Sequence, residues 1–136
     1  MGWWVVVPLA YLLAGAIKFA INSLRTRRLA FDLIGLGGLP STHTAIASAP
    51  AWILLLNGKA QSEIFAIAVA LVAVVVIDAV DLRRKLERVH VVLKQEFPQS
   101  TSAQKLRERV GHRPIEIIAG LAVGGLAALL VKAAGL

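Results

Sequence analysis

The chain has 136 residues, of which 57% are hydrophobic, and its formal net charge is +7. A mean hydropathy of +0.72 implies more apolar surface than one soluble core of this length can hide, so we expect a membrane protein and exclude a water-soluble domain. The basic charge does not indicate nucleic acid, because it lies in two short blocks without interleaved aromatic residues, and the lack of cysteine excludes disulfides and thiolate sites.

The first apolar run, residues 3–21, is predicted to span the membrane, because a spanning helix needs roughly 20 mostly apolar residues. Trp3 and Trp4 are typical interfacial anchors at its start. No basic stretch precedes the run, so we expect a retained helix and not a cleaved signal peptide. A basic segment with a glycine-rich end follows at residues 22–40.

Three further spans are predicted, at residues 41–56, 63–80 and 112–131. The second is short, and Pro50 is expected to kink it. The last has three glycines that allow close helix approach, either inside the bundle or at a face between two copies: Gly120, Gly124 and Gly125.

Between the third and fourth spans, residues 81–111 are polar and basic. Apolar residues at near-helical spacing predict an amphipathic helix over residues 83–96, lying on the membrane surface or against the bundle and ending at Pro98. Because most Lys and Arg fall in residues 22–40 and 81–111, both segments are expected in the cytoplasm. The predicted architecture is one all-α integral membrane domain over residues 1–136, a bundle of about four transmembrane helices plus a cytoplasmic amphipathic helix. Its expected location is a prokaryotic inner membrane.

This topology brings unusual polar residues to one membrane face. His43 opens the second span and His112 opens the fourth. Two imidazoles beside several cations suit phosphoryl transfer, since one can attack phosphorus while the other protonates the leaving oxygen. The cations expected at helix ends on this face are Lys18, Arg25, Arg83 and Arg84.

Three residues close in sequence to the two histidines support a phosphate site. Ser41 and Thr42 start a helix behind a glycine-rich turn, where amides and hydroxyls can bind phosphate. Glu116 lies four residues after His112, so on a helix it would share a face with the ring and accept its N–H.

Plainer readings stand beside these. Each histidine can be a simple interfacial residue, Ser41 a simple helix cap, and the basic block only an orientation signal. Asp78 and Asp81 can form a metal pair, but ion pairing with Arg83 or Arg84 is favoured. No metal or cofactor is required by the residues present.

Three ordered motifs resemble a known family. The run Gly37-Gly38-Leu39-Pro40-Ser41-Thr42-His43-Thr44 resembles the Pro-Ser-x-His motif of the type-2 phosphatidic acid phosphatase superfamily. The Asp-Ala-x-x-x-Arg-Arg pattern at residues 78–84 and the Gly-His-x-Pro-x-Glu pattern at residues 111–116 are similar to its divergent branch of acid phosphatase or vanadium-dependent haloperoxidase-related membrane proteins.

The resemblance implies a helical bundle that hydrolyses phosphate esters through a phosphohistidine without a metal. His112 would be the nucleophile, Glu116 its orienting carboxylate and His43 the general acid. Lys18 and Arg25 keep the spacing of the superfamily's first motif. The expected Ser-Arg dipeptide is absent, since Lys105 and Leu106 occupy its place. The arginine that completes the phosphate site is left open among Arg107, Arg109, Arg83 and Arg84.

The predicted function is therefore a lipid phosphatase acting on a lipid phosphate or pyrophosphate at the cytoplasmic leaflet. Its expected partners are that substrate and membrane lipids, with a homo-oligomer possible because the chain is short. Two alternatives remain: a protein that binds or transports a lipid phosphate without cleaving it, and a structural membrane subunit.

Overall fold

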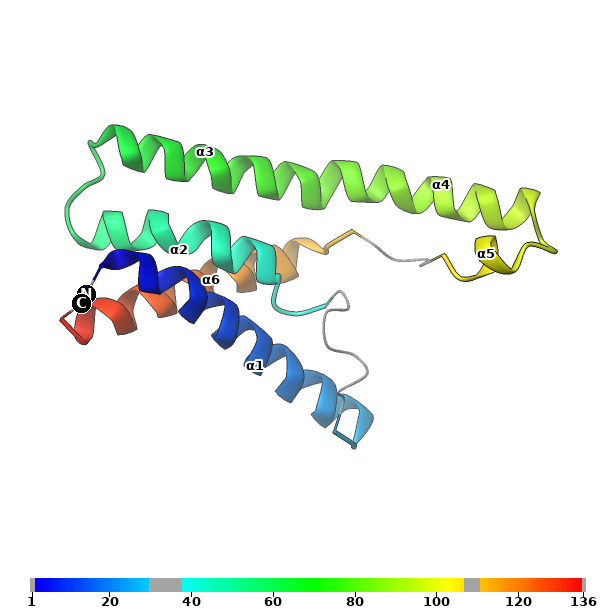
Figure 1. The fold of residues 1–136 in the computed structure, drawn as a ribbon, viewed down its shortest axis with the longest axis horizontal. Coiled ribbons are helices and arrows are strands. Elements are labelled where there is room, and N and C mark those ends of the chain that lie inside the picture. Colours follow the sequence, from blue (N-terminus) through cyan, green and yellow to red (C-terminus); the bar gives the residue numbers. More distant parts are fainter. Residues whose placement is uncertain (1, 30–37, 107–110, 136) are drawn as a thin grey trace.

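The computed structural model describes residues 2–29, 38–106 and 111–135, and over these residues the chain is helical with no strand. The predicted all-α class is confirmed (Figure 1). In chain order the elements are the 3₁₀ turn η1 (Trp3–Val5), α1 (Val6–Thr26), α2 (Thr42–Leu56), α3 (Glu63–Ile77), the π-helical turn η3 (Asp78–Leu82), α4 (Arg83–Glu96), α5 (Thr101–Gln104) and α6 (Pro114–Ala133).

Three helical stretches of the described chain are long and apolar enough to cross a membrane: Trp3–Thr26, Glu63–Glu96 and Pro114–Ala133. The remaining apolar helix, α2, has 15 residues, or about 22 Å at a rise of about 1.5 Å per residue. That is shorter than the hydrocarbon core, which is about 30 Å thick. The predicted four spans are thus three helices of spanning length and one shorter apolar helix.

The short helix α2 packs against α1, α3 and α6 and lies between them (Figure 1). Its tightest contact is with α6, where Gly120 and Gly124 face the backbone of α2. A Cβ on Gly124 would lie 2.8 Å from the Ala45 carbonyl oxygen, and one on Gly120 would lie 2.6 Å from that of Ser41. Of the two alternatives for these glycines, packing inside the bundle is confirmed for Gly120 and Gly124.

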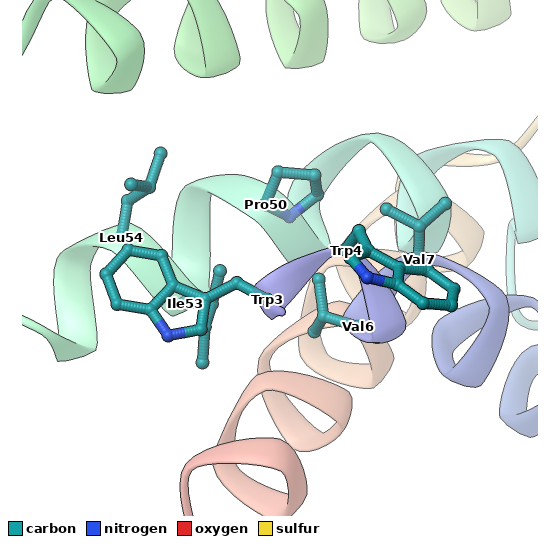
Figure 2. Close-up of a pocket in the computed structure, with 7 residues that line it drawn as sticks. All are labelled: Trp3, Trp4, Val6, Val7, Pro50, Ile53 and Leu54. Atoms are coloured by element: carbon teal, nitrogen blue, oxygen red, sulfur yellow. The ribbon is translucent and has the colours of Figure 1, made fainter. Parts of the chain in front are cut away.

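The main hydrophobic core is built from α1, α2 and α6. It lies at the end of the bundle where the two chain ends meet (Figure 1). Trp3 and Trp4 pack there beside Pro50, which lies inside α2. They border a small apolar cavity of about 180 Å³ (Figure 2). Trp4 is 72% exposed, in keeping with a side chain that meets lipid or headgroups.

The third span and the amphipathic helix form one continuous helix of 34 residues, Glu63–Glu96. The amphipathic helix itself is confirmed as α4, which ends just before Pro98. Its predicted placement is corrected, because α4 continues the line of α3 and does not turn aside (Figure 1). No glycine or proline lies between the two helices. They are joined by the π turn η3, in which the backbone hydrogen bonds reach five residues back and not four.

Candidate functional site

Two backbone hydrogen bonds join three segments at one end of the bundle. The Ser41 N–H at the start of α2 donates to the Glu116 carbonyl oxygen on α6 at 2.8 Å. The His112 N–H, just before α6, donates to the Ala79 carbonyl oxygen in η3 at 3.3 Å. The starts of the predicted second and fourth spans therefore lie together at the same end of the bundle (Figure 1).

Lys18 reaches this end from α1. Lys18 was expected at the end of its helix, but α1 runs on to Thr26, about two turns beyond the lysine. Lys18 is only 8% exposed. Its Nζ donates to Thr42 Oγ1 at 3.3 Å, and the Glu116 carboxylate is close enough to act on the ammonium electrostatically. A buried ammonium of this kind is stabilised by such partners.

Ser41 caps α2. Its Oγ accepts hydrogen bonds from the Thr44 N–H at 3.3 Å and the Thr44 hydroxyl at 2.9 Å. Both side chains are fully buried. The capping reading of Ser41 is therefore confirmed, and phosphate binding by Ser41 and Thr42 stays a prediction.

The two histidines differ in burial but share an electrostatic environment. His43, in the first turn of α2, is exposed, whereas His112 is 6% exposed. The Nδ1 atom of His112 is buried and has no hydrogen-bond partner in the described part of the chain. Lys18 and Arg83 act electrostatically on both rings, and His43 also acts on His112.

His112 precedes α6 and lies outside the spanning helices. Burial lowers the pKa of its imidazole below the ordinary value of 6.5. The Glu116 carboxylate opposes this shift, and the positive charges of Arg83 and Lys18 add to it. A lowered pKa favours the neutral ring, which is the form that can attack phosphorus.

The helical spacing argument for His112 and Glu116 is wrong. The helix begins at Pro114, and Arg113 is extended with ψ 150°, as expected for a residue before proline. Glu116 is the third helical residue, and its Oε2 accepts the Arg113 N–H at 3.1 Å in a capping box. Its role as the orienting carboxylate stays a prediction.

The arginines are placed differently from one another. Arg83 Nε donates to Asp78 Oδ2 at 2.7 Å, which confirms the ion pair predicted for Asp78. Asp81 pairs with Lys85 at 2.8 Å, and no arginine among the described residues pairs with it.

The remaining arginines are less closely tied to the histidines. The side chain of Arg84 runs beside Gly111, the residue before His112. Arg25 is exposed in the last turn of α1, about 10 Å further along that helix than Lys18. No described contact joins it to the histidines. Arg107, Arg109 and most of the glycine-rich run before Ser41 lie outside the described residues.

Two contributors were missed by sequence reasoning. Glu87 Oε1 accepts the Gly111 N–H at 2.7 Å, and the Ala79 carbonyl accepts from His112. A glutamate among the basic residues at the start of α4 gave a weak signal for the first, and a backbone carbonyl gives none. Across the described ranges no three His, Asp or Glu side chains are grouped so as to hold a metal ion.

Together these features define a class: a helical membrane protein with two histidines, a buried lysine and an arginine gathered at one end of its bundle. The chain belongs to the Divergent PAP2 family, whose sequence model matches residues 3–127. It is 29% identical over 139 residues to the uncharacterized membrane protein YuiD of Bacillus subtilis (strain 168), covering 90% of this chain and 88% of that protein. No solved structure matches it. The predicted family is thereby confirmed.

Proposed function

We propose that this protein is a membrane phosphatase that hydrolyses a lipid phosphate or pyrophosphate through a phosphohistidine. In this proposal the site faces the cytoplasmic leaflet of a cell inner membrane, because Lys and Arg concentrate in the two segments that adjoin it in sequence, residues 22–40 and 81–111. The lipid tail lies among the apolar helices, and the phosphate meets the polar end.

In this mechanism the neutral His112 ring attacks phosphorus. The bond from phosphorus to the leaving oxygen breaks, and protonated His43 gives that oxygen its proton. Water then attacks the phosphohistidine while His43 takes up a proton, which releases inorganic phosphate and restores both rings. Lys18 and Arg83 stabilise the charge on the phosphoryl oxygens, aided by Arg84, Arg25 and the hydroxyls of Ser41 and Thr42.

The observation that carries the proposal is that the same two cations act electrostatically on both histidines. Lys18 and Arg83, from α1 and α4, act on both rings, although the four residues are far apart in sequence. Simple interfacial histidines would not need a buried lysine held against the same helix start. Membership of a phosphatase-related family adds support for hydrolysis.

One observation favours a second function, binding of a lipid phosphate without cleavage. The buried Nδ1 of His112 has no hydrogen-bond partner among the described residues. A nucleophilic imidazole is normally oriented through its second nitrogen, as in other histidine-based sites. A site without that bond can still attract an anion.

Phosphate release from phosphatidate, phosphatidylglycerophosphate and a polyprenyl pyrophosphate, measured with chelator present, separates the two functions. The wild type is compared with His112→Ala and His43→Ala, and acid-labile phosphate on the protein is sought by mass spectrometry. We expect release by the wild type, its loss in both variants, and a phosphohistidine on His112. Binding of these lipids by folded wild-type protein without release would refute hydrolysis and favour the second function.

A further inference from the structure

The segment that carries His112 into α6 is held by two consecutive backbone N–H groups. Gly111 donates to Glu87 Oε1 at 2.7 Å, and His112 donates to the Ala79 carbonyl at 3.3 Å. We call these two bonds the His112 anchor. Because they fix neighbouring residues of the main chain, they fix the direction in which the His112 side chain leaves it.

The π turn η3 makes one of the two acceptors available. In an α-helix the Arg83 N–H would bond to the carbonyl four residues back, that of Ala79. Here it bonds to the Asp78 carbonyl, five residues back. Ala79 is 2% exposed, so its carbonyl oxygen is buried away from water and needs a protein donor. His112 supplies one.

The other acceptor is a carboxylate, which gives shorter and stronger hydrogen bonds than a neutral oxygen. The segment also lies close against α4 at this point. A Cβ on Gly111 would lie 3.2 Å from Arg84 Cγ and 3.4 Å from Glu87 Oε1. The approach is therefore a packed contact between the chain before α6 and the first two turns of α4.

We infer that Glu87 is a positioning residue, which holds His112 at the meeting point of the site's charges through the Gly111 amide. This inference rests on the proposed function, in which His112 is the nucleophile. The anchor itself can be measured without any substrate. Displacing a reacting group by about 1 Å can cost roughly a hundredfold in rate, so a side chain that touches no substrate can still control turnover.

The test compares Glu87→Ala with Glu87→Gln, which keeps an oxygen acceptor at the same place. Glu96→Ala is the matched control, because it removes the same charge from the exposed last residue of α4. Amide hydrogen exchange at Gly111 and His112 is followed by NMR in lipid nanodiscs. We expect exchange to rise about tenfold to a hundredfold in Glu87→Ala, as for loss of a bond to a charged acceptor. It should rise less in Glu87→Gln and stay unchanged in Glu96→Ala.

The second readout is the His112 ring, which is easily assigned because the chain has three histidines. In Glu87→Ala its pKa should move up toward 6.5 as the ring loses burial. The charged and titratable groups that act on the ring are left intact in every variant: Glu116, Arg83, Lys18 and His43.

With phosphatidate as the probe, Glu87→Ala should lower kcat roughly tenfold to a hundredfold with a smaller change in KM, and Glu87→Gln should recover much of it. Unchanged exchange at Gly111 and His112 in Glu87→Ala would overturn the inference, even with normal phosphatase activity in the wild type. Raised exchange without phosphate release from any lipid by the wild type would uphold the anchor and refute only the hydrolysis. If Glu87→Ala does not fold, the smaller rise in Glu87→Gln decides.

Discussion

Replacing Gly124 by alanine should push α2 and α6 apart. The new Cβ would lie 2.2 Å from Ser48 Oγ and 2.8 Å from the Ala45 carbonyl oxygen. The hydroxyl can rotate away, but the carbonyl belongs to the helix backbone and cannot. The contact is well inside the 3.4 Å at which ordinary packing begins, so the helices themselves must move.

Gly125, the next residue, provides the matched control. The three atoms nearest to a Cβ there would all belong to the Trp52 ring, at 3.4–3.5 Å. Both substitutions gain the same helix propensity, about 1 kcal/mol for Gly to Ala. The difference in stability between the two variants therefore isolates the clash, which we place at about 1–3 kcal/mol from the cost of overpacking a core.

The assay is reversible unfolding in mixed micelles, followed by far-ultraviolet circular dichroism. The free energy of unfolding of Gly124→Ala should be lower than that of Gly125→Ala by that amount. Equal stability of the two variants, or a more stable Gly124→Ala, would show that α2 and α6 do not pack this closely.

Two further predictions concern one hydrogen bond and the dependence of activity on pH. Trp52→Phe removes the indole N–H that donates to the Leu121 carbonyl at 3.0 Å, and should lower the free energy of unfolding by about 0.5–1.5 kcal/mol in the same assay; no change would mean that the bond is not formed. The acid limb of kcat/KM for phosphate release should lie below pH 6.5, because burial lowers the pKa of His112 and only the neutral ring attacks. Glu116→Gln removes the charge that opposes this shift, so the limb should move to still lower pH; a move upward would contradict the assignment.

The helices were largely predictable because they depend on composition. Runs of apolar residues broken by polar blocks indicated the order of the elements, and Pro98 marked the end of α4. The start of α6 at Pro114 was placed two residues too early, at His112. The union of α3 and α4 was not predictable in this way. Hydropathy changes sharply near Asp81, but a helix continues through such a change when no residue there disfavours it.

The candidate site shows a similar division. His43, His112 and Lys18 stand out because polar groups are rare beside apolar runs, and the fold brings them within electrostatic reach. The arrangement of Glu116 was mistaken, because regular helix spacing was assumed across a residue that precedes proline. Glu87 and the Ala79 carbonyl escaped notice because their partners are backbone amides, whose identity depends on tertiary contact alone.

The π turn at Asp78–Leu82 also sets the angle by which the side chains of α4 are rotated about the helix axis relative to those of α3. Each residue of an α-helix turns the chain by about 100°, so one residue fewer in this stretch would rotate α4 by about that angle relative to α3. Glu87 would then point away from Gly111, although the sequence of α4 itself was unchanged. Insertions and deletions should therefore be tolerated less between Asp78 and Leu82 than at Asn57–Gly58. There the chain turns between α2 and α3, so a change of length does not rotate α4 relative to α3.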